Sequence, residues 1–165
     1  MTPKQNLPKM KICLKTPLGI CEITGDEDGI SEIKILDEER ASDDSIPELF
    51  IPAVNQINAY FRGELKDFSL KLNPKGTPFQ KTVWQSLLEI PFGETNSYMD
   101  VSKRLGAVKA IRAVAAANGK NPLWIVIPCH RVIGSDGSLT GYAGGLWRKK
   151  WLLEHENPFS QQSLF

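Results

Sequence analysis

Short apolar segments rich in β-branched residues alternate with turns in the first part of the chain. The segments cover residues 11–14, 19–23 and 30–35, with Thr16-Pro17 and the glycine-bounded residues 25–29 between them. Such segments, separated by Pro and Gly turns, predict an antiparallel meander. From Pro47 to Gly63 the apolar positions recur about every 3.6 residues, which predicts one amphipathic helix over the sheet.

Three helices are predicted next. Residues 77–80, Thr-Pro-Phe-Gln, resemble a helix start, because Thr can cap, Pro fits the first turn and Gln can reach back. This helix should run to about residue 89. Residues 97–100 repeat the capping pattern before a short helix that ends at Gly106, and a third helix should span residues 108–117. The last two form a helix-turn-helix with residues 108–117 in the recognition position.

The remaining pattern predicts an extended apolar stretch at residues 123–127, a hairpin around residues 134–137 and a last helix over residues 146–156. Two prolines and a glycine near residues 74–77 predict a linker between domains of residues 1–73 and 78–165. The predicted fold class is α+β. A small antiparallel sheet-and-helix domain precedes a mostly helical domain of winged helix-turn-helix type.

Composition narrows the class of protein. The 165 residues are 41% hydrophobic and 24% charged, which is ordinary for a globular chain and argues against disorder, collagen or a coiled coil. Charged residues interrupt every apolar run before the roughly 18 residues of a membrane span, and the first residues lack the apolar core of a secretory signal. Three cysteines do not suggest a disulfide framework, so we expect a reducing, cytoplasmic location and no membrane association.

Charge is divided unevenly along the chain. Residues 1–75 contain 10 Lys and Arg against 13 Asp and Glu, whereas residues 76–165 contain 10 against 6. A basic second part suits a polyanionic partner such as nucleic acid. A modestly basic solvated surface would have the same composition, so charge alone leaves both readings open.

Cys129 is the principal candidate for chemistry. Residues 128–132, Pro-Cys-His-Arg-Val, place a thiol beside an imidazole and a guanidinium. A free thiol has a pKa of about 8.5, so a base or positive charge is needed to activate it near neutral pH. His130 could take the proton through a bridging water, and Glu156 could orient the imidazole if the last helix packs nearby. A buried cysteine with an incidental neighbour is the alternative for this pair alone.

Residues 127–133, Ile-Pro-Cys-His-Arg-Val-Ile, resemble the active-site signature of the O6-alkylguanine-DNA alkyltransferases, also called methylated-DNA–protein-cysteine methyltransferases. The resemblance is strong over residues 78–156 and only architectural before them. Further motifs in family order lie at residues 91–98, 111–114, 121–122, 141–146 and 151–156.

The resemblance implies stoichiometric, self-inactivating repair of O6-alkylguanine in double-stranded DNA, and possible repair of O4-alkylthymine. The damaged base is flipped out of the duplex, since a side-chain sulfur cannot reach it in the stack. Cys129 is then nucleophile and acceptor, His130 and Glu156 activate it, Tyr98 donates to the leaving base, and Arg112 fills the space that the base vacates.

The resemblance also assigns binding residues. The recognition helix, slim because of its alanines, would approach the minor groove. The implied DNA contacts are Arg112, Ala115, Ala116 and Ser97. The implied pocket residues are Asn121, Val132, Tyr142, Ala143 and Gly144. We expect no cofactor and a monomer. We also expect no metal, because Cys13 and Cys21 have no histidine near them with which to complete a zinc site.

Two other functions remain as alternatives. A Cys-His-Glu hydrolase of acyl substrates would regenerate its thiol and turn over, and it would need an oxyanion hole that the sequence does not display. A DNA-binding regulator could instead sense alkylation or oxidation at Cys129.

Overall fold

The computed structural model describes residues 9–158, so the outer ends of both predicted domains, residues 1–8 and 159–165, lie outside the described residues. The chain divides between Pro74 and Lys75 into two compact units, which are described separately.

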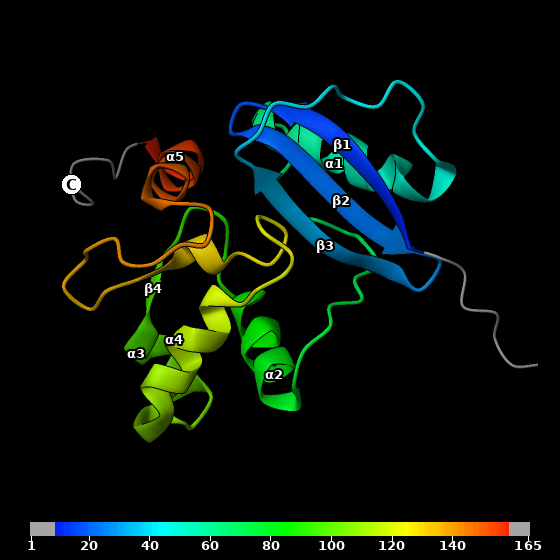
Figure 1. Ribbon diagram of the computed structural model, residues 1–165. Helices are drawn as coiled ribbons and strands as arrows, with labels where there is room; N and C mark the ends of the chain where they lie inside the picture. Colours follow the sequence, from blue (N-terminus) through cyan, green and yellow to red (C-terminus); the bar gives the residue numbers. More distant parts are fainter. Residues whose placement is uncertain (1–8, 159–165) are drawn as a thin grey trace, which may run out of the picture. The chain divides into compact units, whose positions relative to one another are not determined.

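The first unit is an antiparallel meander backed by one helix (Figure 1). The strands are β1 (Met10–Thr16), β2 (Gly19–Asp26) and β3 (Gly29–Leu36), and the helix is α1 (Ile51–Phe61), preceded by the 3-10 turn η1 (Glu48–Phe50). Ile23 pairs with Ile12 on one side and Ile33 on the other, and all three are buried. The helix contributes the buried Ile57 and Tyr60, so the predicted sheet-and-helix arrangement is confirmed.

The outer edge of β1 is covered by the loop after β3. Asp43 N donates to Cys13 O at 3.0 Å, and the Asp43 carboxylate accepts from Cys13 N at 2.7 Å. Edge strands left open invite pairing with other chains, so this loop protects the sheet.

The second unit is mostly helical. Its helices are α2 (Pro78–Leu87), α3 (Tyr98–Arg104), α4 (Ile111–Gly119) and α5 (Leu146–Glu156). Capping boxes begin two of them, Thr77 with Gln80 at α2 and Ser97 with Asp100 at α3, as the sequence predicts. The helices α2, α3 and α4 pack on one another, and Trp84 Nε1 of α2 donates to Ala117 O of α4 at 2.8 Å. The helix-turn-helix consists of α3 and α4.

The predicted third helix begins differently from its expected form. Residues 108–110 form a separate 3-10 turn, η2 (Val108–Ala110), and only from Ile111 is the backbone α-helical. The helix then continues past residue 117 to Gly119.

The prediction of an extended stretch at residues 123–127 is wrong. Val126 N donates to Trp124 O at 2.8 Å and Ile127 N donates to Leu123 O at 2.9 Å, so the segment is a buried turn. Ile125 has a φ of 74°, a value that β-branched residues rarely adopt. A short apolar run is equally compatible with a buried strand and with other buried structure, which is why the pattern misleads here.

The predicted hairpin around residues 134–137 forms a turn but not a pair of strands. Gly134 N donates to Ser138 O at 2.9 Å, while β5 (Val132–Ile133) pairs in parallel with the distant β4 (Asn96–Ser97). This two-residue pairing connects the start of α3 to the segment that contains Cys129.

Candidate active site

Cys129 begins the 3-10 turn η3 (Cys129–Arg131), directly after the buried turn and directly before β5. Its N–H donates to Ile127 O at 2.8 Å, and its side chain is buried. Burial raises the pKa of the Cys129 thiol to about 11, although a hydrogen bond with Asn121 and the charge of Lys149 act in the opposite direction. The thiol is therefore protonated at neutral pH in this structure, and its reaction needs a base.

His130 is placed to supply that base. Its Nε2 lies 2.7 Å from Glu156 Oε2, and both side chains are buried. Burial lowers the pKa of His130, and the neighbouring Glu156 carboxylate opposes that change without reversing it. Because the carboxylate accepts, we assign the ring proton to Nε2, and Nδ1 keeps its lone pair. Nδ1 is buried and has no hydrogen-bond partner among residues 9–158.

Arg131 holds Glu156 in its ionised form. Its Nε and Nη2 donate to the two carboxylate oxygens at 2.7 and 3.0 Å, and its Nη1 donates to Ile90 O at 2.7 Å. Burial alone would raise the pKa of Glu156, but the contacts with His130 and Arg131 outweigh it, so the pKa is lowered. The guanidinium beside the thiol in the sequence thus bonds to the carboxylate.

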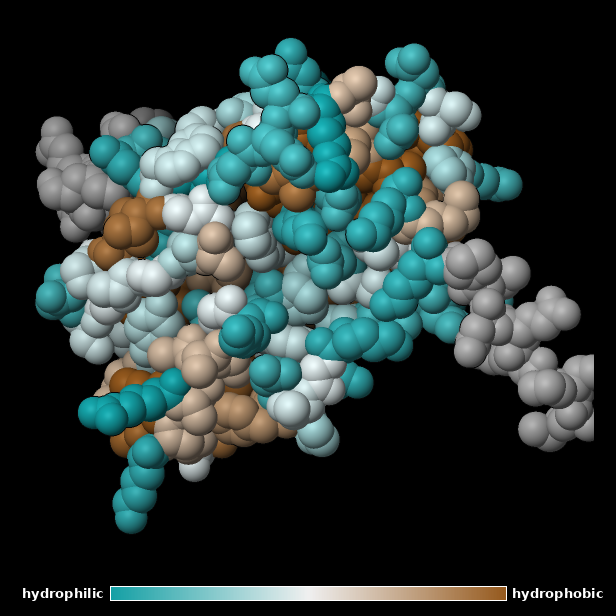
Figure 2. Space-filling view, viewed as in Figure 1, coloured by the Kyte–Doolittle hydropathy of each residue, from teal (hydrophilic) through white to brown (hydrophobic). Residues whose placement is uncertain are grey.

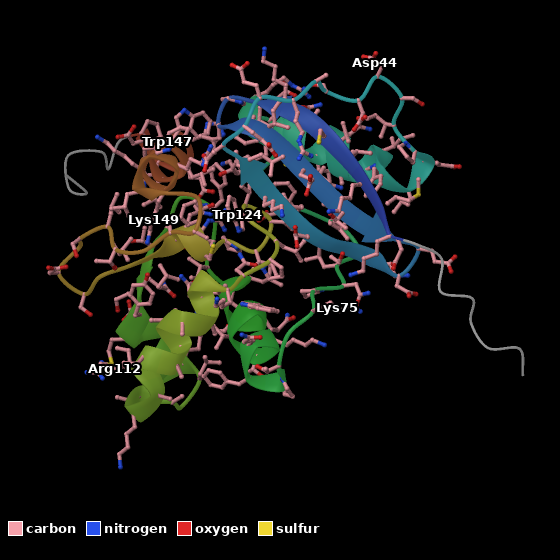
Figure 3. All side chains as sticks on the ribbon, in the orientation of Figure 1. Asp44, Lys75, Arg112, Trp124, Trp147 and Lys149 are labelled. Atoms are coloured by element: carbon pink, nitrogen blue, oxygen red, sulfur yellow. The ribbon has the colours of Figure 1, made fainter. Side chains whose placement is uncertain are left out.

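Lys149 of α5 is a second buried cation that sequence reasoning missed. Its Nζ donates to Val132 O at 2.6 Å, Thr140 O at 2.8 Å and Gly141 O at 3.2 Å. Burial lowers the pKa of Lys149 to about 8, so it is mostly charged at neutral pH. In Figure 3 it lies beside β5 and the following loop, and its three bonds hold that loop against the strand.

The first turn of α5 reverses the usual distribution of polarity. Its apolar residues Leu146 and Trp147 are about half exposed, whereas the basic Arg148 and Lys149 are buried. A basic pair on the inner side of an otherwise amphipathic helix is the signal that could have identified Lys149.

Tyr98 begins α3, next to the loop that Lys149 holds. Its hydroxyl donates to Thr140 O at 3.0 Å, the carbonyl that also accepts from Lys149. Burial raises the pKa of Tyr98, against the opposing effects of hydrogen bonds with Thr140 and Asn118. The hydroxyl therefore keeps its proton at neutral pH and is a donor.

The buried asparagines Asn118 and Asn121 connect the end of α4 to the reactive segment. Asn121 Nδ2 donates to Ile127 O at 2.8 Å and to Leu123 O at 3.4 Å, and its Oδ1 accepts from Leu123 N at 2.9 Å. It thus shapes the buried turn before Cys129. Asn118, which the sequence analysis did not single out, lies in α4 itself and reaches Cys129 O at 3.5 Å.

The predicted pocket residues lie around this segment. Val132 is buried in β5, and Tyr142, Ala143 and Gly144 belong to the loop before α5. A Cβ on Gly144 would lie 3.0 Å from the rings of both Trp124 and Tyr142, so only glycine fits without a shift. Trp124, labelled in Figure 3, is thus a further residue of this loop cluster that the sequence analysis did not identify.

The predicted DNA contacts on α4 share one face. Arg112 and Ala116 are exposed and Ala115 is half-buried, while Val114 and Ala117 face the core. Figure 2 shows pale brown side chains over the helices of this region with hydrophilic chains extending from them, and Figure 3 shows Arg112 pointing outward from α4. The face is slim, weakly apolar and carries a projecting cation.

Ser97, the remaining predicted DNA contact, uses its side chain within its own helix start. Its Oγ accepts from Asp100 N at 2.9 Å, which makes it the cap of α3. Its side chain is half-buried.

Residues 9–158 contain neither a cluster of metal-ligating side chains nor a membrane-spanning helix. No group of three or more His, Cys, Asp or Glu in that range could hold a metal ion, and the paired register of β1 and β2 places Cys13 and Cys21 on opposite faces of the sheet. No helix in the same range is long and apolar enough to cross a membrane.

Comparisons with known proteins agree in both units. Residues 10–74 match the ribonuclease-like domain of 6-O-methylguanine DNA methyltransferases, and residues 78–158 match the DNA binding domain of the same family. A methylated-DNA–protein-cysteine methyltransferase of Methanosarcina acetivorans is 46% identical over 149 residues, which cover 86% of this chain and 94% of the relative.

Solved structures give the same result. The O6-methylguanine methyltransferase of Mycobacterium tuberculosis superposes with a TM-score of 0.82 at 42% identity, over 92% of this chain and 94% of that one. The M. tuberculosis protein solved in complex with DNA gives a TM-score of 0.81 at 42% identity, over 94% and 98% of the two chains. With both domains matched and a relative 46% identical over most of its length, the chain belongs to the 6-O-methylguanine DNA methyltransferase family.

Proposed function

We propose that this protein repairs O6-alkylguanine in double-stranded DNA by moving the alkyl group onto Cys129. The observation that carries the proposal is the buried His130, whose Nδ1 has no partner among the described residues and whose Nε2 is fixed by the ionised Glu156. Such a ring can remove a proton from the adjacent thiol, directly or through one water. The family of the chain supports transfer from methylated DNA.

The chemical step is an in-line displacement. His130 Nδ1 takes the thiol proton as the Cys129 sulfur attacks the alkyl carbon, the carbon–O6 bond breaks, and its electron pair passes to the guanine. Guanine is a poor leaving group as a free anion, so a donor is required where charge develops. The Tyr98 hydroxyl, which keeps its proton at neutral pH, suits that role once it exchanges Thr140 O for the base.

The positive charge of Lys149 contributes to the same step. It lowers the pKa of Cys129 and thereby favours the thiolate as the thiol proton leaves. Its bonds to Thr140 O and Gly141 O also fix the loop that carries Tyr142 and Gly144, the proposed pocket wall.

The exposed face of α4 is the proposed DNA-binding surface. Alanines at positions 115 and 116 allow close approach to a groove, and Arg112, which points outward from α4, would enter the duplex in place of the flipped base. The DNA complex of the M. tuberculosis relative supports DNA as the partner. We expect the protein to act as a monomer. We also expect it to work in a reducing cytoplasm, because the acceptor must be a free thiol.

The function is tested with two substrates, a damaged duplex that requires base flipping and a free alkylated base that does not. Wild-type protein should take a labelled methyl group from a duplex that contains one O6-methylguanine. Arg112→Ala should slow this reaction by about tenfold or more, whereas its reaction with free O6-benzylguanine should change less than about twofold, because only the duplex needs a substitute for the extruded base.

Lys109→Ala, in the 3-10 turn η2 directly before α4, is the matched control and should weaken binding to damaged and undamaged DNA alike. If Arg112→Ala slows the reactions with the duplex and with the free base equally, Arg112 contributes to the structure of the pocket and not to base flipping. If the wild-type protein acquires no label from the damaged duplex, the proposed function is contradicted.

A further inference from the structure

Arg104, in the last turn of α3, uses all three nitrogens of its guanidinium in hydrogen bonds to other elements. Its Nε and Nη2 donate to Oγ and O of Ser86 at 3.0 and 3.2 Å, and its Nη1 donates to Asn96 Oδ1 at 2.8 Å. Its Nε also lies 3.3 Å from a carboxylate oxygen of Glu89. Ser86 belongs to the last turn of α2 and Asn96 to β4, so one side chain joins three elements.

The end of α2 is a firm anchor for this side chain. Ser86 is buried, and its carbonyl is one of the last four of the helix, which have no partner in the regular helical pattern. A cation at that end of a helix is favourable, and the planar fork of arginine presents its donors in fixed directions, unlike the ammonium of lysine. Arg104 therefore holds β4 at a fixed position relative to α2.

β4 needs this support because it is only two residues long. Its pairing with β5 joins Asn96 to Val132 and the next residue of each strand. Pairings of two strands are marginal without further contacts. Tyr98 follows β4 directly, and β5 directly follows the turn that contains Cys129, so the position of the Tyr98 hydroxyl relative to the sulfur depends on β4.

We propose that Arg104 is a positioning residue for the transfer step: by fixing β4 to the end of α2, it holds the Tyr98 hydroxyl where charge develops on the leaving base. The inference rests on the proposed transfer to Cys129, with Tyr98 as donor to that base. Arg104 acts on the base only through Tyr98. Its loss should therefore slow the displacement itself and leave binding of the base nearly unchanged.

The test uses free O6-benzylguanine, so that DNA binding does not enter the measurement. In single-turnover experiments with excess base, the limiting rate of Cys129 alkylation reports the displacement, and the half-saturating concentration reports binding. Arg104→Met should lower the limiting rate about fivefold, as expected for one weakened hydrogen bond in the transition state, and change the half-saturating concentration less than about twofold. Lys103→Met, the matched control, removes the same charge from the adjacent exposed position and should keep the wild-type rate.

Two further variants separate positioning from charge and from general stability. Arg104→Lys keeps the charge but loses the planar fork, so its limiting rate should stay near that of Arg104→Met. In a Tyr98→Phe background, Arg104→Met should slow the reaction by less than about twofold, because the effects of residues that act through one another are not additive. A residue with only a general structural role would cause the same loss in both backgrounds.

These rates are first order in protein, so they do not depend on the fraction of the preparation that is folded. If Arg104→Met does not fold, Asn96→Ala removes the acceptor of Arg104 in β4 and gives the same comparison. The inference is overturned if Arg104→Met keeps the wild-type limiting rate, if Arg104→Lys restores that rate, or if the loss is equal with and without the Tyr98 hydroxyl, while Cys129 is still alkylated. If the wild-type protein acquires no benzyl group on Cys129, the proposed function itself is contradicted.

Discussion

Cys129→Ser should abolish methyl transfer and leave DNA binding unchanged within about twofold. A serine hydroxyl is far harder to ionise than a thiol, so the rate should fall by at least about a thousandfold. Binding should persist because the exposed face of α4, which carries Arg112, is not altered. The measurements are label transfer from a duplex with one O6-methylguanine and binding of the same duplex in a gel or anisotropy assay.

Cys13→Ser is the matched control, because Cys13 lies on the edge strand β1 in the other unit of the chain. It should transfer at the wild-type rate. Substantial transfer by Cys129→Ser would mean that a different residue accepts the alkyl group.

Glu156→Gln should impair both stability and reaction. The change leaves the buried Arg131 guanidinium without its countercharge and His130 without its anionic acceptor. Removing one partner of a buried ion pair costs about 3–5 kcal/mol, so the free energy of unfolding should fall by an amount of that order. Urea unfolding at pH 7 measures it.

The same substitution at Glu154 provides the control on the same helix, since Glu154 pairs only loosely with the exposed Lys150 at 3.9 Å. Glu154→Gln should change the free energy of unfolding by less than about 0.5 kcal/mol. If Glu156→Gln lowered the free energy of unfolding by as little, the buried contacts of Glu156 would not stabilise the fold.

Acid should reduce the difference in the free energy of unfolding between the wild-type protein and Glu156→Gln. The folded protein lowers the pKa of Glu156, so the stabilisation is complete above the ordinary glutamate pKa of about 4.3. It is lost as the pH falls through the lowered folded-state pKa. The gap in unfolding free energy should thus persist through mildly acidic conditions and close only in strong acid.

The reaction of Glu156→Gln should also become more dependent on pH. Without an oriented base the thiol must ionise by itself, and burial raises the pKa of Cys129 to about 11. The transfer rate should therefore rise about tenfold per pH unit above neutrality, a steeper rise than in the wild type. An unchanged pH profile in both this variant and His130→Ala would reject activation of the thiol by His130 and Glu156.

Local signals in the sequence predicted local structure well. Thr77 with Gln80 and Ser97 with Asp100 mark helix starts because a cap involves only neighbouring residues, and both capping boxes are present. The meander followed from short strands and glycine turns in the same way.

Features that depend on distant partners could not be predicted. One local feature was also missed: the apolar residues 123–127 were predicted to form a strand, but the side chain of the nearby Asn121 bonds to both ends of the segment and closes it as a turn. The parallel pairing of β4 with β5 joins segments more than thirty residues apart and leaves no pattern in either.

The candidate site shows the same limit. Cys129, His130 and Glu156 were singled out from chemistry and motif, and the structure brings His130 and Glu156 within 2.7 Å. Arg131 and Lys149 were missed as buried groups because burial of a cation depends on acceptors elsewhere in the fold, such as Ile90 O and Val132 O. Because both side chains are positively charged, the sequence suggested that both are exposed to solvent.

Single, irreversible transfer of the alkyl group to Cys129 is best tested by titrating the protein with excess methylated duplex. A thioether has no carbonyl for water to attack, so the thiol cannot be restored as it would be in an acyl-enzyme. We expect a single burst of repair equal to the active protein concentration, with one methyl group on the peptide that contains Cys129. Steady turnover with unmodified Cys129, as a hydrolase would show, or a methyl group on another residue would contradict it.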